Sequence, residues 1–551
     1  MENILQNNPN KKIILLGNEA IVRGALESGV NFVSTYPGTP ASEIGNIFYK
    51  IAKDAGVYFE FSTNEKVALE AAIGASFSGL KTLVAMKNFG LNVALDALFP
   101  FVYTGSKGPT VIIVADDPSC HSSAQSEENS RGVALPTHIP ILEPSDPQEC
   151  KDFVKLGYQI SEKFKIPVMI RTTTRVAHQK SQVVLGEIPK KSVPKAEFVK
   201  NKNQFVTLPP RVLEMKKELL EKIEKIREFS EKSNINKIIG AGNKKIGIIT
   251  SSISYLNVME ALNDLKISIP ILKLGFFNPL PKEKIKKFIK PLKKVLIAEE
   301  LEPFLEKEVG RLAKEVNCKL EIYGKDLLPE IGELTPEIVI SAIAKITNKK
   351  YPIKAKTSNL KTQKRLPQLC PGCPYWLVIS AVKKALQLDS GQARKDVIFG
   401  GEIGCYMLFG NSPVDLQDYL SCMGSSVGIA HGIKKSTGQK IIAFVGDSSF
   451  FHSGIPPLIN TVFNKSNPLI IILNNETTAM TGHQPHPVSA GTDSGINLEN
   501  IVKACGVKYV KTIDQANQEE FINTVKEFLE KDEVSVIIAK HPCVFVAKKN
   551  V

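Results

Sequence analysis

The sequence predicts a multidomain α/β protein built on doubly wound parallel sheets. Its 551 residues are too many for one hydrophobic core, so we expect about three or four domains. Short apolar runs alternate with helical patterns along most of the chain. Such alternation is typical of parallel sheets that carry helices on both faces. Several apolar runs end in polar residues, which predicts ligand-binding side chains at the carboxyl edges of these sheets.

The first half of the chain predicts one such domain and a linker. Residues 1–185 carry the first alternating block, and residues 186–243 are rich in lysine and glutamate, which predicts a linker with a helix over Arg211–Lys232. In the first block we expect a helix at Glu19–Glu27 and strands at Ile13–Leu16, Thr82–Met86, Thr110–Ala115 and Ile166–Ile170.

The second half predicts two further α/β domains. Residues 244–350 form one block, residues 351–366 a basic, turn-rich linker, and residues 367–551 the last block. In the middle block we expect strands at Ile246–Thr250, Pro270–Leu274 and Val295–Glu299.

Composition excludes several classes of protein. Hydrophobic residues make up 43% of the chain and charged residues 23%, as in an ordinary soluble globular protein. Apolar stretches are too short for a membrane span and the first residues lack a signal-peptide core, so we expect a cytoplasmic protein without a membrane partner. The net charge of +14 comes mostly from lysine and favours a solvated lysine-rich surface over attraction of acidic partners. Zinc-finger spacing and aromatic–basic interleaving are missing, so we expect no nucleic-acid partner.

Two apolar runs end in polar residues that suit a metal and a diphosphate. Ile441–Val445 is followed by Gly446-Asp447-Ser448, and Leu469–Leu473 is followed by Asn474-Asn475. Two buried parallel strands would bring both polar ends to one edge of a sheet. Carboxylate and amide oxygens there suit a hard divalent cation that keeps positions open for diphosphate oxygens.

This stretch resembles the thiamine-diphosphate motif, in which GDG or GDS is followed at a fixed range of distances by NN. Asn475 lies 28 positions after Asp447, a spacing typical of the motif. The resemblance implies thiamine diphosphate and Mg²⁺ as cofactors. It also implies that Asp447, the Asn475 side chain and the Thr477 carbonyl hold the Mg²⁺, with Gly446 and Ser448 at the cofactor.

The front of the chain offers two helix starts. The turn Tyr36–Pro40, which contains Thr39, opens one helix, and Asn64-Glu65-Lys66 opens another. Helix starts have free backbone N–H groups that bind anions. Taken alone, Glu65 is typical of a helix N-terminal charge. Together with the diphosphate motif it is the leading candidate for the acid that contacts the aminopyrimidine ring of thiamine.

Four of the nine cysteines lie in turns of the last block. Cys370 and Cys373 form a CxxC, Cys405 ends GEIGC, and Cys543 lies in HPC. Four thiolates from separate loops bind either zinc or a 4Fe–4S cluster, and the spacing does not discriminate between them. We expect ordinary thiols at the remaining five, which are Cys120, Cys150, Cys318, Cys422 and Cys505.

The chain resembles the alpha (large) subunits of indolepyruvate ferredoxin oxidoreductases, in the 2-oxoacid:ferredoxin oxidoreductase superfamily. The matching stretches are YPGTPASEI (36–44), NEKVALEAAIGAS (64–76), MKNFGLNVALD (86–96), ADDPSCHSS (115–123), ILEPSDPQE (141–149), RTTTRVAH (171–178), LCPGCP (369–374), GEIGCY (401–406) and the stretch 446–487. The resemblance implies a pyrimidine-binding domain over 1–185, a transketolase-C-like domain over 244–350 and a diphosphate-binding domain with a cysteine cluster site over 367–551.

The resemblance also implies roles for individual residues. Glu65 matches the acid that activates the cofactor, and Thr39 the threonine that contacts the 2-oxoacid carboxylate. Thr481, Gly482 and His483 match the loop that closes over the diphosphate. The ligands of one 4Fe–4S cluster are matched by Cys370, Cys373, Cys405 and Cys543. His483 is the candidate catalytic histidine of this loop, and both His483 and His486 are open to either a proton-transfer or a structural role.

The implied reaction is oxidative decarboxylation of a 2-oxoacid, an aryl pyruvate such as indolepyruvate, to acyl-CoA and CO₂. Electrons would pass through the iron–sulfur cluster to ferredoxin, and coenzyme A would take the acyl group. The family implies a small beta subunit as partner, and we expect a hetero-oligomer built on a dimer. A non-oxidative thiamine-dependent decarboxylase or carboligase is the alternative, because it needs Glu65, Asp447 and Asn475 but no cluster. A non-catalytic assembly subunit is the third hypothesis.

Two features depart from the family pattern. Alpha subunits of this family usually continue into a ferredoxin-like domain, whereas this chain ends at Val551. We therefore expect at most one cluster here, and a separate ferredoxin or ferredoxin-like subunit as the acceptor. In addition, Tyr375-Trp376 stand where the family usually has His-Arg, which puts the particular substrate and acceptor in doubt.

Overall fold

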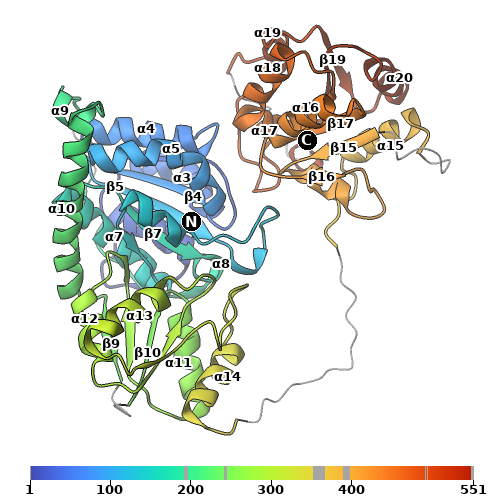
Figure 1. Cartoon of the computed structure of the whole chain (residues 1–551). Coiled ribbons are helices and arrows are strands. Elements are labelled where there is room, and N and C mark those ends of the chain that lie inside the picture. Colours follow the sequence, from blue (N-terminus) through green and yellow to red (C-terminus); the bar gives the residue numbers. More distant parts are fainter. Residues whose placement is uncertain are drawn as a thin grey trace. The chain divides into compact units, whose positions relative to one another are not determined.

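The computed structural model describes residues 2–190, 196–240, 245–351, 366–388, 397–489, 492 and 494–547. The chain divides into two compact units, unit 1 over Met1–Thr357 and unit 2 over Ser358–Val551 (Figure 1). Within the described residues, none of the helices combines the length and the apolar character that crossing a membrane requires. The linker predicted at 351–366 lies almost entirely outside the described residues.

Unit 1 contains a seven-stranded sheet in the order β12-β6-β7-β5-β4-β2-β3. Its strands are β2 (Phe32–Thr35), β3 (Tyr58–Phe61), β4 (Thr82–Lys87), β5 (Thr110–Asp116), β6 (Ile141–Leu142), β7 (Val168–Thr173) and β12 (Phe276–Asn278). All neighbours are parallel except β12 and β6. Three of the strands predicted for the first block are thereby confirmed as β4, β5 and β7.

Helices cover both faces of this sheet, as Figure 1 shows. They are α2 (Gly17–Glu27), α3 (Ser42–Ala55), α4 (Glu65–Phe77), α5 (Asn88–Thr104) and α7 (Pro147–Phe164). Successive residues of a strand point to opposite faces. On β2, Ser34 Oγ donates to the Ala68 carbonyl of α4 at 2.7 Å, whereas the methyl group of Thr35 lies against Gly45 of α3. The sheet is therefore doubly wound, as predicted.

The strand predicted at Ile13–Leu16 forms but lies outside this parallel sheet. It is β1 (Lys12–Leu16), and it pairs antiparallel with β8 (Lys180–Val184) in a separate two-stranded sheet. Interior strands of a doubly wound sheet are buried on both faces, as β4 is throughout. Ile14 is 69% exposed, so β1 has only one face to bury.

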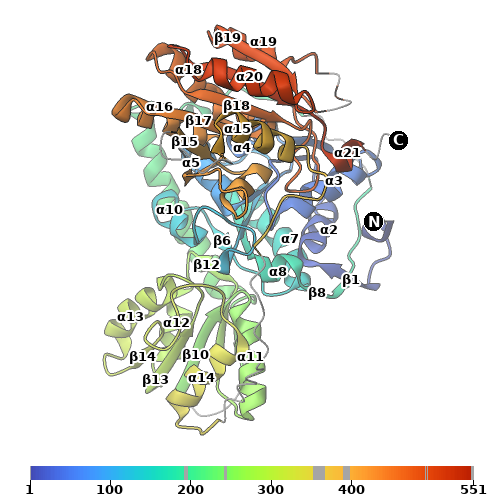
Figure 2. The same ribbon diagram turned by 90° about the vertical axis from the view of Figure 1, so that its right-hand side faces the viewer.

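The second sheet of unit 1 has the order β14-β13-β10-β11-β9, with β9 antiparallel at one edge. Its strands are β9 (Lys237–Ile239), β10 (Ile246–Ser251), β11 (Ile271–Leu274), β13 (Lys294–Ala298) and β14 (Glu321–Tyr323). Two separate apolar clusters lie on its two faces, one with α11 (Ser254–Leu265) and α14 (Pro336–Thr347), the other with α12 (Lys282–Ile289) and α13 (Phe304–Val316). Figure 2 shows this layered arrangement. The three strands predicted here are confirmed, whereas β9 and β14 were missed.

The helix predicted at Arg211–Lys232 is α10, with those bounds. Its buried residues Met215, Leu219, Ile223 and Ile226 recur every three or four positions and form one apolar stripe. That stripe packs against α5, α7 and α12 (Figure 1). The segment expected to be a linker therefore contributes both a packed helix and the edge strand β9 to unit 1.

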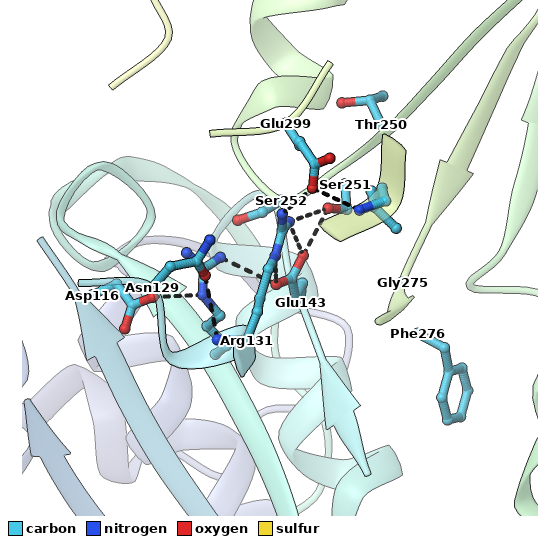
Figure 3. A network of polar contacts seen from close by, with 12 residues as sticks. Asp116, Asn129, Arg131, Glu143, Thr250, Ser251, Ser252, Gly275, Phe276 and Glu299 are labelled. Atoms are coloured by element: carbon cyan, nitrogen blue, oxygen red, sulfur yellow. Dashed lines mark hydrogen bonds and ion pairs between the residues drawn. The ribbon is translucent and has the colours of Figure 1, made fainter. Parts of the chain in front are cut away.

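A buried charged network joins the two sheets of unit 1, and Figure 3 shows it at close range. Arg131 donates two hydrogen bonds to Glu143, which follows β6. Its Nε lies 2.7 Å from Glu143 Oε1, and its Nη2 lies 2.6 Å from Glu143 Oε2. Its Nη1 reaches Glu299, which follows β13, at 2.9 Å, and its Nη2 also donates to Ser251 at the end of β10 at 2.7 Å. Arg171 completes the network with Nη1 at 3.1 Å from Glu143.

Unit 2 contains a six-stranded sheet in the order β16-β15-β17-β18-β20-β19, parallel throughout. Its strands are β15 (Val397–Gly401), β16 (Tyr419–Leu420), β17 (Lys440–Gly446), β18 (Leu469–Asn474), β19 (Tyr509–Asp514) and β20 (Ser535–Lys540). One face packs against α15 (Tyr375–Ala385) and α20 (Gln518–Phe528), the other against α16 (Ser425–Thr437), α18 (Ile455–Phe463) and α19 (Leu498–Ala504). The short remaining helices of the two units are α1 (Glu2–Leu5), α6 (Ala134–Thr137), α8 (Thr174–His178), α9 (Lys202–Phe205), α17 (Asp447–Ser449) and α21 (Val544–Ala547).

Candidate functional site

The sheet of unit 2 has a topological switch point between β15 and β17. The chain runs from β15 to β16 on one side and then crosses to β17 on the other. Ligands of open α/β sheets bind beside the carboxyl ends of strands at such a point. Glu402 follows β15 and Asp447 follows β17, so GEIGC and GDS meet at this crevice.

Asp447 is held by the backbone that follows the neighbouring strand. β17 and β18 are parallel neighbours, as predicted, with Gly446 in register with Leu473. Asp447 Oδ2 accepts hydrogen bonds from the amides of Asn475 at 3.1 Å and Glu476 at 2.9 Å. The carboxylate is only 2% exposed, so these amides replace the water that would otherwise solvate it.

The side chain of Asn475 is fixed in the same turn. Its Oδ1 accepts a hydrogen bond from the Thr477 amide at 3.1 Å, and both residues are buried. The turn therefore gathers a carboxylate, an amide oxygen and backbone carbonyls, all of them hard oxygen donors. That donor set suits Mg²⁺, which prefers oxygen ligands and retains positions for phosphate oxygens.

The loop after this turn is closed on itself. Thr478 and Gln484 form an isolated β-bridge, and Thr481 Oγ1 lies 2.7 Å from the buried Gln484 Oε1. Gly482 between them has φ +123°, a conformation that residues with a Cβ rarely adopt.

The two histidines of the loop have different surroundings. His486 Nε2 lies 3.3 Å from Asp447 Oδ2, and the imidazole is nearly buried. The His483 ring instead lies 5.8 Å from that of Phe545, centroid to centroid. Of the two histidines that the sequence left undecided, His486 is the one beside the candidate metal carboxylate.

The four cysteines named from the sequence follow strands or turns around the same edge. Cys405 begins the turn after β15, and the Cys543 amide, after β20, donates to the Asn475 carbonyl at 3.1 Å. Cys370 and Cys373 share a tight turn, closed by the Cys373 amide on the Cys370 carbonyl at 3.0 Å. Cys405 and Cys543 thus follow strands β15 and β20 of the sheet, whereas Cys370 and Cys373 lie in the turn before α15.

The thiols also interact electrostatically. Burial, with the nearby thiols of the set, raises the pKa of Cys405 to about 12 and that of Cys373 to about 11. Among the described residues, three or more His, Cys, Asp or Glu side chains nowhere stand in a metal-holding arrangement. The four sulfur atoms are thus mutual neighbours without the close geometry of a ligand set.

Glu402 lies in the GEIGCY stretch (401–406), and no role was predicted for it from the sequence. This carboxyl is fully buried, contacts the Tyr406 hydroxyl, and accepts hydrogen bonds from the amides of Gly424 at 2.9 Å and Gly446 at 3.4 Å. Burial raises the pKa of Glu402 to about 8 against the opposing effect of those amides. The raised pKa favours the neutral form of this acid, which accepts a hydrogen bond from Gly446 of the GDS motif. The signal for it in the sequence was a glutamate directly after a buried strand.

Unit 1 has its own switch point, between β2 and β4. The chain leaves β2 for β3 on one side, and β4 lies on the other. The turn with Thr39 follows β2, and Glu65 begins α4 behind the Asn64 cap. Glu65 is 6% exposed, and a Cβ on Gly90 would lie 2.6 Å from its Oε1, so a larger residue at position 90 would displace the Glu65 side chain.

Two family descriptions match the chain, one in unit 1 and one in unit 2. Residues 23–222 match "Pyruvate flavodoxin/ferredoxin oxidoreductase, thiamine diP-bdg", and residues 402–539 match "Thiamine pyrophosphate enzyme, C-terminal TPP binding domain". The fold and both switch-point sites therefore define a thiamine-diphosphate enzyme of the 2-oxoacid oxidoreductase class.

Relatives narrow this class. The chain is 42% identical to the indolepyruvate oxidoreductase subunit IorA of Methanothermobacter marburgensis over 98% of this chain and 88% of the relative. It is equally 42% identical to the subunit of the same name from Pyrococcus horikoshii, over 98% of this chain and 87% of that one. The chain belongs to the family of indolepyruvate oxidoreductase alpha subunits, among the 2-oxoacid:ferredoxin oxidoreductases.

A solved structure shows the same fold at lower similarity. The 2-oxoglutarate:ferredoxin oxidoreductase of Magnetococcus marinus superposes with a TM-score of 0.50 at 17% identity, over 62% of this chain and 66% of that one.

Proposed function

We propose that the chain catalyses the oxidative decarboxylation of an aryl pyruvate such as indolepyruvate to acyl-CoA and CO₂, and passes the electrons through a 4Fe–4S cluster to ferredoxin. One observation carries this proposal: the strand ends of unit 2 bring the GDS and NN segments together with Cys405 and Cys543 at one edge. A thiamine site needs only the GDS and NN segments. The presence of Cys405 and Cys543 beside them is explained by redox chemistry. Bound thiamine diphosphate supplies the electron sink on which a 2-oxoacid loses CO₂.

Residues of unit 2 are proposed to hold the cofactor. Asp447, the Asn475 side chain and the Thr477 carbonyl would bind Mg²⁺, because they are buried oxygen donors of one turn. Gly446 and Ser448 would lie at the diphosphate, with Thr481 and Gly482 in the loop over it. His486, which lies beside Asp447, would be the histidine that interacts electrostatically with the metal site, rather than His483.

Residues of unit 1 are proposed to act on the ring and the substrate. Glu65 would contact the aminopyrimidine ring, since it is buried at a helix start and packs closely against Gly90. Thr39 would contact the 2-oxoacid carboxylate. On this proposal residues 1–185 form the pyrimidine-binding domain, 244–350 the transketolase-C-like domain and 367–551 the diphosphate-binding domain.

The partners follow from the reaction. Acyl transfer requires coenzyme A, and the electrons require a ferredoxin or ferredoxin-like subunit. A relative named as subunit IorA supports a small beta subunit as the companion of this chain. We propose a hetero-oligomer built on a dimer.

The alternative is a non-oxidative thiamine-dependent decarboxylase or carboligase. The observation in its favour is that the four thiols of the described chain do not stand in a ligand arrangement.

Anaerobic co-expression with the small subunit separates the two. We expect a brown complex with about four irons per chain, and CO₂ release from phenylpyruvate or indolepyruvate that depends on ferredoxin. Cys405→Ser should lose iron and ferredoxin reduction, whereas the matched control Cys505→Ser should keep both. An iron-free complex that still releases CO₂ would establish the alternative, and a preference for aliphatic over aryl 2-oxoacids would overturn the substrate assignment.

A further inference from the structure

Lys87 is the last residue of β4 and lies at the switch point of unit 1. β4 is the neighbour of β2 in the sheet, and the turn with Thr39 follows β2. The two strand ends are in close contact, because a Cβ on Gly38 would lie 2.9 Å from the Lys87 Cβ. The lysine therefore stands at the crevice where an α/β sheet binds its ligand.

The ammonium group of Lys87 is buried, and it lies 5.2 Å from the centroid of the Phe89 ring. Its side chain is 10% exposed, and Nζ donates to the Ser122 carbonyl at 2.9 Å. Its acidic neighbour is Asp117, whose Oδ2 lies 3.9 Å away, beyond hydrogen-bond distance. Burial lowers the pKa of Lys87 to about 8, although Asp117 and the Cys120 thiol act in the opposite direction. A lysine in this position gains stability from a further anion.

Asp117 is already satisfied by other groups. Its Oδ2 accepts from the Ser122 amide at 2.8 Å and the Ser123 hydroxyl at 2.7 Å, and its Oδ1 accepts from the Thr174 hydroxyl at 2.5 Å. Burial alone would raise the pKa of Asp117, but these hydrogen bonds and Lys87 outweigh burial and lower it. Asp117 is thus an anchor of its own loop, and it leaves much of the Lys87 charge uncompensated.

That loop also links Lys87 to the proposed substrate residues. Ser122 accepts from Lys87 with its carbonyl and donates from its hydroxyl to the Thr39 carbonyl at 3.1 Å. On the other side, Gly90 of α5 lies three residues after Lys87 and packs against Glu65. Lys87 is therefore flanked by the two residues of unit 1 proposed to act on substrate and cofactor.

We propose that Lys87 binds the carboxylate of the 2-oxoacid beside Thr39. This inference rests on the proposed function. It assigns the Lys87 ammonium group as the cation that binds the carboxylate, which all 2-oxoacids share. A charge-assisted hydrogen bond from a buried ammonium group is among the stronger contacts available to a carboxylate. When the carboxylate leaves as neutral CO₂ the ion pair ends, and Lys87 returns to Ser122 and Asp117.

The test uses the co-expressed complex and two probes of nearly the same shape, 3-phenylpropionate and its uncharged amide. Lys87→Met keeps most of the length of the side chain and removes its charge. We expect the dissociation constant of 3-phenylpropionate, from calorimetry, to rise about 10- to 100-fold, with that of the amide unchanged. The KM for phenylpyruvate should rise by a similar factor, while thiamine diphosphate affinity stays at the wild-type value.

Lys81→Met is the matched control. Lys81 immediately precedes the same strand at its other end and also donates to a backbone carbonyl, that of Ser28, at 2.9 Å. This variant should bind both probes as the wild type does. A second measurement needs no variant: wild-type affinity for 3-phenylpropionate should fall as the pH rises through about 8, where Lys87 loses its proton, and affinity for the amide should not.

The outcomes separate this inference from the proposed function. If the wild type turns over phenylpyruvate and Lys87→Met keeps its affinity for 3-phenylpropionate, the role of Lys87 is overturned and the function stands. If the wild type turns over no 2-oxoacid, yet Lys87→Met still loses 3-phenylpropionate and not the amide, Lys87 binds carboxylates and the function is overturned. A pH-independent affinity in the wild type would also overturn the role of Lys87.

Discussion

Glu143 in unit 1 and Glu402 in unit 2 are the same residue type with pKa values shifted in opposite directions. Each directly follows a buried strand and is fully buried. Glu143 faces Arg131 and Arg171, which outweigh the effect of burial and lower its pKa to about 2. Glu402 faces a tyrosine hydroxyl and two backbone amides, and burial raises its pKa to about 8.

The difference shows that partners, and not burial alone, decide the charge of a buried carboxyl group. Unit 1 places a network of buried ion pairs where its two sheets meet, in which Arg131 contacts Glu143 and Glu299, and Arg171 contacts Glu143. Figure 3 shows the contacts of Arg131. In unit 2 the raised pKa of Glu402 favours a neutral acid beneath the GDS turn, where a second carboxylate beside Asp447 would repel the diphosphate proposed to bind there. Variants at these two sites test the comparison.

The largest effect is expected from Arg131→Met. The change leaves Glu299 buried at 1% exposure without its arginine and leaves Glu143 with Arg171 alone. Breaking a buried pair from one side costs about 3–5 kcal/mol. Calorimetric unfolding should show a marked fall in the melting temperature. An unchanged melting temperature would mean that the network does not hold the two sheets together.

A smaller loss of stability is expected from Glu402→Ala. It removes the acceptor of the Gly424 amide, and a buried unpaired amide costs about 1–3 kcal/mol. The melting temperature of the complex at pH 6 reports this loss. Glu402→Gln at the same pH is the control, since its neutral amide can accept from Gly424 and should keep near-wild-type stability.

The pH dependence of stability should distinguish Glu402 from its glutamine variant. The folded-state pKa of about 8 lies above the ordinary value of 4.5, so the folded protein retains a proton that the unfolded chain loses. Wild-type stability from this group is therefore full below pH 4.5 and falls between pH 4.5 and 8, by up to about 1.4 kcal/mol per pH unit. Glu402→Gln should lack this component of the slope in unfolding experiments over that range. Parallel curves for the two proteins would show that Glu402 is ionised in the fold.

The smallest effect is expected from Arg175→Met. Arg175 pairs with Glu333 as tightly as Arg131 pairs with Glu143, but its side chain is 61% exposed. Exposed pairs contribute about 0–1 kcal/mol because water solvates both partners when they separate. A loss as large as that of Arg131→Met would refute the claim that burial sets the importance of the network.

Much of the fold follows from local patterns. The mainly apolar runs that became β4, β5, β17 and β18 were recognisable because strands buried on both faces have few polar positions, most of them at their ends. Ile13–Leu16 was misplaced, since an apolar run does not reveal whether both of its faces will be covered. β12 was missed for a related reason. A strand of three residues carries little signal, and β12 forms by pairing with β6, which is far away in the sequence.

The sequence by itself was sufficient to propose the chemical groups of the candidate site. The spacing of Asp447 and Asn475, the CxxC at Cys370 and the helix start at Glu65 are local features, since strand ends and turns are encoded by neighbouring residues. The tertiary structure alone decided which groups meet and in which charge state. Strand order brings Glu402 beneath Gly446 and Lys87 beside the Thr39 turn, and burial with or without a counter-charge then sets their protonation. Strand order and burial depend on contacts between residues far apart in the chain, which no local pattern contains.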